Sequence, residues 1–341
     1  MEGVMRFINN QFTWICGKKF RKAALQLNQL TIQNTLMNRR EALSSIAAVS
    51  AAGIVPAEAA KAKAQSFIYS LNMSTLRGQK LGFRKELEVA AKAGYGSVEI
   101  WISTLQDYLK GGGTLQEAKR IIGDLGLKVE DAIGFATWIV DDEAARAKAL
   151  DQLKGEMEQL AAIGCPRVAA PPMGATTGAS LDLARVAERY RAILELGDKT
   201  GVVPHLELWG FSKNLSRVGE ILYVAVESGH PSARLLMDVY HLHKGGSGMD
   251  AIKDVGKPLI EIFHVNDYPK TPPRESITDA DRVYVGDGIA PWKNVIQSLK
   301  NPDKPIILSF EVFNKDYWAQ DALEVAKTSL VKMKKIVEAA V

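Results

Sequence analysis

The sequence is poor in the features that mark several large classes of protein. It has only two cysteines, Cys16 and Cys165, among 341 residues, which excludes a disulfide-rich scaffold. No apolar run is long and strong enough to span a bilayer, so no stable membrane insertion is expected. No Gly-x-Gly-x-x-Gly motif follows the first apolar strand-like run, which argues against a dinucleotide-binding fold.

Charge is distributed unevenly along the chain. The formal net charge is +4, yet residues 1–64 alone carry nine basic and three acidic residues. The rest of the chain has 34 basic and 36 acidic residues. The basic excess therefore belongs to the N-terminus, and no basic face for nucleic acid is predicted.

Residues 1–64 are predicted to form an N-terminal extension with an export signal. Arg39 and Arg40 precede a mildly apolar, alanine-rich run, and residues 62–64, Ala-Lys-Ala, offer a small-x-small cleavage site. This order resembles a twin-arginine signal, which is an address read by a receptor rather than an anchor. It predicts a periplasmic protein. A disordered tail with a chance arginine pair, on a cytoplasmic protein, is the alternative.

From residue 65 onward, apolar strand-like runs alternate with longer amphipathic helical patterns. The strand-like runs are 66–72, 97–101, 128–135, 167–172, 202–209, 234–241, 260–267 and 305–313. Helical spacing is clearest over 83–95, 142–164, 181–201 and 320–340. This order predicts an α/β fold, a (β/α)8 TIM barrel that forms a single domain over 65–341 after the signal segment. An open doubly wound sheet is the alternative.

Polar residues interrupt or end four of the later strand-like runs. They are Glu207 in HLELWG, Asp238 in LLMDVYH, His264 in IFHVND and Glu311 in LSFEVFN. In a barrel the carboxyl ends of the strands share one face. A lone buried carboxylate is costly, whereas one divalent cation can satisfy several. Three carboxylates and an imidazole suit Mn2+, Mg2+ or Co2+. For each acid taken alone, a helix cap or an ion pair is the alternative.

These motifs resemble those of the xylose isomerase-like sugar isomerase/epimerase superfamily. The resemblance extends over 66–340 and includes LELW, MDVYH, FHVND, SFEVF and the VGDG turn at 285–288. It implies a (β/α)8 barrel and one divalent metal ion held by the residues at the matching positions, Glu207, Asp238, His264 and Glu311.

The resemblance also implies roles for residues near the metal. Glu207 and Glu311 match the pair that exchanges the substrate proton in the ketose epimerases, and His241 matches a histidine that contacts a substrate oxygen. The chain departs from those epimerases at Lys213, where they carry a second substrate-binding glutamate. The lysine either holds an anionic or keto group or is solvated at the start of a helix.

The implied activity is that of a metal-dependent sugar isomerase or epimerase. A carboxylate removes a proton next to a carbonyl, and the metal ion stabilises the resulting enediolate. The alternative is a metal-dependent lyase or dehydratase that acts on a keto-sugar, keto-glycoside or inosose. A noncatalytic carbohydrate-binding barrel is a third reading. A small-molecule carbohydrate is the expected partner in each case, and a homo-oligomer is an open alternative to a monomer.

Further residues are candidates for contacts with the substrate. Trp101 and Trp209 lie near strand ends, where their rings can either stack on a sugar or fill the barrel. The loop 266–292 is expected to lie over the barrel mouth. Its Arg274 can reach a substrate oxygen or form a surface salt bridge.

Overall fold

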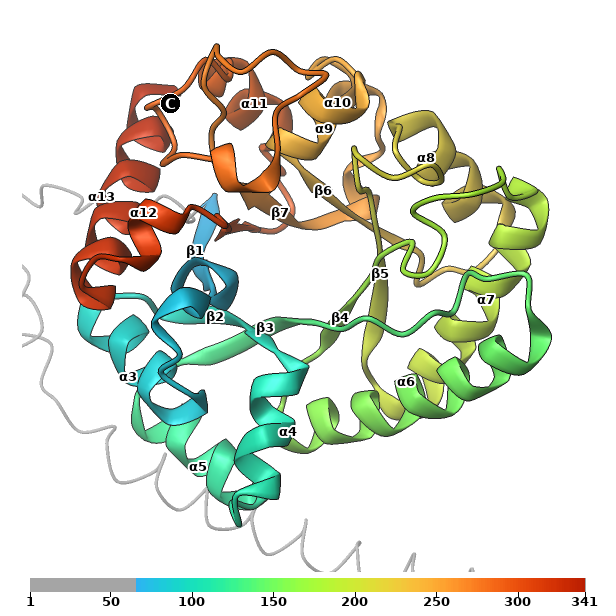
Figure 1. The fold of residues 1–341 in the computed structure, drawn as a ribbon, viewed down its shortest axis with the longest axis horizontal. Coiled ribbons are helices and arrows are strands. Elements are labelled where there is room, and N and C mark those ends of the chain that lie inside the picture. The colour runs from blue at the N-terminus through green and yellow to red at the C-terminus, as the bar shows by residue number, and fades with distance from the viewer. Residues whose placement is uncertain (1–65, 341) are drawn as a thin grey trace, which may run out of the picture. The chain divides into compact units, whose positions relative to one another are not determined.

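A computed structural model describes residues 66–340 of the chain (Figure 1). The predicted export signal within 1–64, with Arg39 and Arg40, lies outside the described residues. Within 66–340, no helix has both the length and the apolar character needed to cross a membrane.

Eight parallel strands form a nearly closed barrel with helices around it (Figure 1). Their bounds are β1 Phe67–Asn72, β2 Ser97–Trp101, β3 Lys128–Ile133, β4 Arg167–Ala170, β5 Val203–Glu207, β6 Arg234–Asp238, β7 Ile260–Val265 and β8 Ile306–Phe310. Backbone pairing follows the order β3-β2-β1-β8-β7-β6-β5-β4. The pairing of β1 with β8 joins the two ends of the chain's strand order and confirms the predicted barrel over the open sheet.

Helices follow the strands in the alternating order that was predicted. The longer ones are α3 Phe83–Ala93, α4 Ile102–Lys110, α5 Leu115–Asp124, α6 Glu143–Ile163, α7 Leu183–Thr200, α8 Val218–Glu227, α11 Trp292–Leu299 and α13 Ala322–Ala340. The short ones are η1 Met73–Gln79, α9 Val239–Gly245, α10 Ala251–Asp254, η2 Lys257–Leu259, η3 Asp279–Asp281 and α12 Lys315–Trp318.

Local sequence signals explain where the long helices begin and end. Asp142 caps α6 by accepting a hydrogen bond from the Ala145 backbone N–H, and Asp182 caps α7 in the same way. Both helices end at a glycine in the left-handed region, Gly164 with φ 86° and Gly201 with φ 78°. Residues with a Cβ adopt this conformation at a cost, so glycine is the favoured helix stop.

The barrel interior explains how the polar strand ends are supported. Side chains two residues apart on a strand share a face. Leu236 and Ile262 therefore point inward beneath Asp238 and His264, and they pack with Ala169 and Ile307 in an apolar cluster. A much larger apolar core is shared by the strands and the helices outside them.

One predicted boundary is wrong in a way that matters for the site. The run 234–241 was expected to be one strand, but β6 ends at Asp238 and α9 begins at Val239. The Asp238 side chain accepts a hydrogen bond from the His241 N–H, which caps the new helix. His241 therefore lies in the first turn of a helix rather than on a strand.

Candidate metal and substrate site

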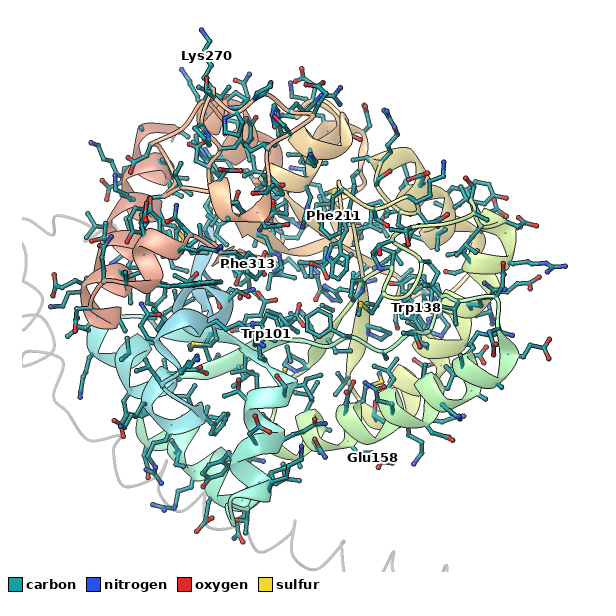
Figure 2. All side chains as sticks on the ribbon, in the orientation of Figure 1. Trp101, Trp138, Glu158, Phe211, Lys270 and Phe313 are labelled. Carbon is teal, nitrogen blue, oxygen red and sulfur yellow. The ribbon has the colours of Figure 1, made fainter. Side chains whose placement is uncertain are left out.

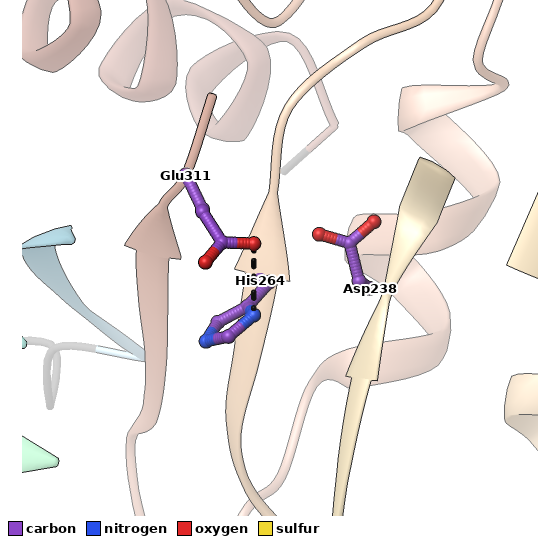
Figure 3. A group of neighbouring side chains, drawn as sticks. All are labelled: Asp238, His264 and Glu311. Carbon is purple, nitrogen blue, oxygen red and sulfur yellow. Dashed lines mark ion pairs between the residues drawn. The ribbon is translucent and has the colours of Figure 1, made fainter. Parts of the chain in front are cut away.

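Asp238, His264 and Glu311 come together at the carboxyl ends of three neighbouring strands (Figure 3). Each is buried and offers a ligand atom, and these three atoms all lie within 4.8 Å of one another. The strand register brings them together, because Asp238 pairs with His264, and His264 pairs with Ser309 two residues before Glu311. Three of the four predicted ligands are thus adjacent.

Asp238 is fixed by contacts to both of its carboxylate oxygens. Its Oδ1 accepts the His241 backbone N–H at 2.9 Å, and its Oδ2 accepts a bond from the Asn266 side-chain amide at 2.7 Å. The helix-cap and ligand readings of this residue are therefore compatible, because a carboxylate has several lone-pair sites.

The His264 ring is oriented by a carboxylate that sequence analysis did not identify. Its Nε2 lies 3.0 Å from both carboxylate oxygens of Glu99 on β2, and Glu99 also accepts a 2.6 Å bond from Ser309 Oγ. Burial opposes a charged ring, but Glu99 and Glu311 raise the pKa of His264 well above its ordinary value. The only sequence signal was an acid inside the apolar run SVEIW.

Glu311 is held by polar contacts to each of its oxygens. Oε1 accepts bonds from Asn72 Nδ2 at 3.1 Å and Ser74 Oγ at 3.3 Å. Oε2 accepts a 2.8 Å bond from the Arg282 guanidinium and lies 3.5 Å from His264 Nδ1. Burial alone would raise the pKa of Glu311, but His264 and Arg282 hold it well below its ordinary value. The carboxylate is therefore ionised.

Arg282 is the second important residue that sequence analysis missed. Its side chain is 1% exposed, and its NH1 donates to Glu311 and, at 3.4 Å, to Asp238 Oδ2. Its NH2 contacts His241 Nε2 at 3.0 Å and donates to Asp279. The residue lies three positions before the VGDG turn that the sequence analysis singled out, but nothing local showed that it turns inward.

His241 is neutral in this arrangement. Burial and the neighbouring Arg282 lower its pKa to about 4. Because Arg282 only donates, His241 Nε2 must accept, and the ring proton belongs on Nδ1. The ring lines the cavity described below. Its contact with a substrate oxygen stays a prediction.

Glu207, the fourth predicted ligand, ends β5 and is buried on the wall of the same cavity. It is not part of the three-residue group whose ligand atoms lie within 4.8 Å of one another. Burial raises the pKa of its carboxyl to about 8, and His264 opposes this rise only in part. Its role as a ligand stays a prediction.

A cavity of about 220 Å³ opens beside these residues. Its polar wall holds Glu207, His241, Asp279, Arg282 and Glu311. The rest of its lining is apolar and consists of Ile133 with five aromatic residues, Trp101, Phe135, Trp209, Phe211 and Phe313. Figure 2 shows Trp101, Phe211 and Phe313 around the barrel mouth, whereas Trp138 lies farther out. The structure thus places both predicted tryptophans, Trp101 and Trp209, in the cavity wall.

Two basic residues that the sequence analysis considered, Arg274 and Lys213, do not line this cavity. The Arg274 side chain is 43% exposed and pairs with Glu275 at 3.1 Å, which favours the surface salt bridge. Lys213 is exposed, which favours its reading as a solvated residue. Arg282 is the arginine that reaches the cavity, because the loop 266–292 folds back over the strand ends.

The donor set fits a divalent metal ion. It offers carboxylate oxygens and one imidazole, which is a mixture that divalent ions bind well. His264 Nδ1 is buried without a hydrogen-bond partner among residues 66–340, while its other nitrogen contacts Glu99. An imidazole that contacts a carboxylate at one nitrogen and turns the other toward the remaining ligands, here Glu311 Oε2 at 3.5 Å, is the usual arrangement of a metal-binding histidine.

Comparison with known proteins supports the same architecture. A model of the family described as "Xylose isomerase-like TIM barrel" matches residues 87–331. The inosose isomerase of Halalkalibacterium halodurans is 26% identical over 258 residues, which cover 73% of this chain and 90% of that protein.

Two solved structures share the fold at low sequence identity. The zinc-bound IOLI protein superimposes with a TM-score of 0.73 at 22% identity and covers 80% of this chain and 99% of its own. An L-ribulose 3-epimerase has a TM-score of 0.65 at 18% identity, with coverage of 81% and 95%.

Proposed function

Because the chain belongs to the xylose isomerase-like TIM-barrel family, we propose that it is a metal-dependent sugar isomerase or epimerase. The observation that supports this most directly is that Glu207 and Glu311 both line the cavity that opens beside the Asp238–His264–Glu311 group. The inosose isomerases and the epimerase to which the chain is similar have activities of this kind. The substrate is a keto-sugar or an inosose.

Asp238, His264 and Glu311 would hold the ion, and Glu207 would be the fourth ligand. When bound, a divalent cation polarises a carbonyl oxygen as a Lewis acid. This polarisation would make the proton on the adjacent carbon more acidic.

The protein's own groups carry out the proton transfer. One of the two cavity carboxylates, Glu207 or Glu311, removes the proton from the carbon next to the carbonyl, and the other returns one. Return to the opposite face of the same carbon is epimerisation, and return to the neighbouring carbon is aldose–ketose isomerisation. Arg282 lines the cavity and donates to the oxygen on which negative charge develops.

The aromatic wall keeps water away from the reacting carbon. Trp101 and Phe135 have ring centroids 5.0 Å apart, and Trp209 stacks on Phe211 at 5.3 Å. Apolar walls of this kind strengthen electrostatic contacts inside the site and suit the C–H face of a sugar ring.

The proposal is tested by incubating metal-loaded protein in D2O with a panel of inososes and keto-sugars. We expect deuterium to enter the carbon next to the carbonyl, and chelation of the metal to abolish this exchange. Glu311→Gln should lose at least about a hundredfold in rate, as expected for removal of a general base. Glu275→Gln, an exposed control on the loop, should match the wild type. Full activity in Glu311→Gln would refute the assigned proton transfer.

A lyase or dehydratase is the second candidate function. The residue that supports it is Lys213, because this position differs from that of the ketose epimerases. Ketose epimerases carry a substrate-binding glutamate there, whereas Lys213 is exposed. The same carboxylates would remove the proton, and an oxygen on the next carbon would leave instead of a proton returning. If mass spectrometry of the products shows loss of water or of an aglycone, the reaction is that of a lyase or dehydratase.

A further inference from the structure

The guanidinium of Arg282 contacts two of the three side chains that form the metal-binding group. Its NH1 donates to Glu311 Oε2 at 2.8 Å and to Asp238 Oδ2 at 3.4 Å. Both carboxylates are nearly fully buried, as is the arginine. One cation of the protein itself therefore neutralises the oxygens that a metal ion needs.

Contacts to both terminal nitrogens and to two aromatic rings hold the guanidinium in this position. NH2 is held by Asp279 and His241. The Cζ atom lies 4.4 Å from the ring centre of Tyr240 and 5.1 Å from that of Phe313. The guanidinium is thus held where it meets the two ligand carboxylates.

The backbone that carries Arg282 is tied down as well. Its carbonyl oxygen accepts a 2.9 Å bond from the Asn314 side-chain amide, and Val283 pairs with Asp267 just after β7 through two 2.9 Å backbone bonds. The arginine is therefore attached to the strand ends that supply the ligands.

We propose that Arg282 is an internal counter-ion that competes with a divalent metal ion for the carboxylates of Asp238 and Glu311, and so sets how tightly the protein holds its metal. The inference rests on the metal site of the proposed function. Two cations beside the same buried oxygens repel each other, and burial leaves this repulsion poorly screened. Without metal, the arginine prevents the two carboxylates from repelling each other.

Removal of the guanidinium charge should therefore destabilise the metal-free protein and strengthen the binding of metal. In Arg282→Met the metal-free protein has two buried carboxylates without a balancing arginine, so its melting temperature should fall. The same variant should bind Mn2+ at least about tenfold more tightly, because the competing charge is gone. The rise in melting temperature on addition of metal should consequently be larger than in the wild type.

The experiment measures Mn2+ affinity by isothermal titration calorimetry on the full chain, after metal is removed by chelation. Arg282→Lys keeps the charge and should stay close to the wild type. Lys244→Met removes a cation that bonds to the backbone carbonyls of 274, 275 and 277 but not to the carboxylates, and it should leave the affinity unchanged. If Arg282→Met does not fold without metal, Arg282→Gln gives the same comparison.

The outcomes separate this inference from the proposed function. Tighter binding in the uncharged variants, with little change in Arg282→Lys and Lys244→Met, supports competition. Equal or weaker binding by Arg282→Met and Arg282→Gln, while the wild type binds Mn2+, overturns the counter-ion role and leaves the proposed function standing. If none of the proteins binds a divalent ion, both the inference and the metal-dependent function fail.

Discussion

Asp267→Asn should loosen the loop that carries Arg282, although Asp267 touches neither a ligand nor the cavity. The Asp267 carboxylate is fully buried and is the acceptor for four N–H groups. Its Oδ1 accepts from the backbone of Tyr268 at 2.8 Å and Ala290 at 3.0 Å. Its Oδ2 accepts from the Gly286 backbone at 2.9 Å and the Trp292 indole at 2.8 Å.

The size of the effect follows from counting donors. An asparagine side chain replaces one oxygen with an NH2 group, so the two N–H groups that faced this oxygen lose their acceptor. Each buried unsatisfied donor costs about 1–3 kcal/mol, so the free energy of unfolding should fall by about 2–6 kcal/mol. Asp267 also packs closely against Gly288 in the same turn. A Cβ on Gly288 would lie 2.2 Å from Asp267 Oδ1, so no larger residue fits there without a shift.

The measurement is urea denaturation of Asp267→Asn beside the wild type, with Asp250→Asn as the control. The Asp250 side chain is 81% exposed, and its one ion pair within residues 66–340 is with Lys253, so its replacement should change stability by less than about 0.5 kcal/mol. Hydrogen exchange over 266–292 should rise in Asp267→Asn before the barrel strands exchange. A loss below about 1 kcal/mol would show that the loop does not depend on this carboxylate, and the reasoning would fail.

Two more substitutions test the electrostatics of buried carboxyl groups, Glu99 beside the metal-binding group and Glu86 on α3. Glu99→Gln should weaken Mn2+ binding by about 10–100-fold in calorimetry, because Glu99 orients His264 and raises its basicity; an unchanged affinity would contradict this role. Burial raises the pKa of Glu86 to about 7, with Arg77 opposing, so its protonated form is favoured in the folded protein. The free energy of unfolding should therefore fall as the pH rises from about 4.5 to about 7, and Glu86→Gln should gain up to ~3 kcal/mol at about pH 8 with no gain at about pH 4. Denaturation curves that give the same gain at both pH values would contradict the assignment.

The metal-binding group shows how far local patterns reach. Asp238, His264 and Glu311 were recognisable because each interrupts or ends an apolar run, and a parallel barrel collects the ends of its strands at one face. Glu207 was chosen for the same reason, yet it lies on the cavity wall outside the three-residue group. Strand order alone does not determine how far each side chain reaches into the site.

Glu99 and Arg282 show what local patterns miss. Glu99 meets His264 across 165 positions of the chain, and it looks like any acid in a strand until β1 pairs with both β2 and β8 and the strands curve into a barrel. Arg282 meets Asp238 only because the loop 266–292 folds back over the strand ends. Its neighbours in the sequence, Asp281 and Val283, do not mark it as a residue that enters the site.

The sequence by itself determined the alternation of strands and helices and the face on which the polar strand ends gather. These follow from local periodicity, helix caps and helix stops, which act over a few residues. Only the tertiary structure decided that Glu99 orients His264 and that Arg282 bridges Asp238 and Glu311. Such contacts depend on strand register and on the path of a long loop, and both are set by the packing of the whole barrel rather than by any one segment.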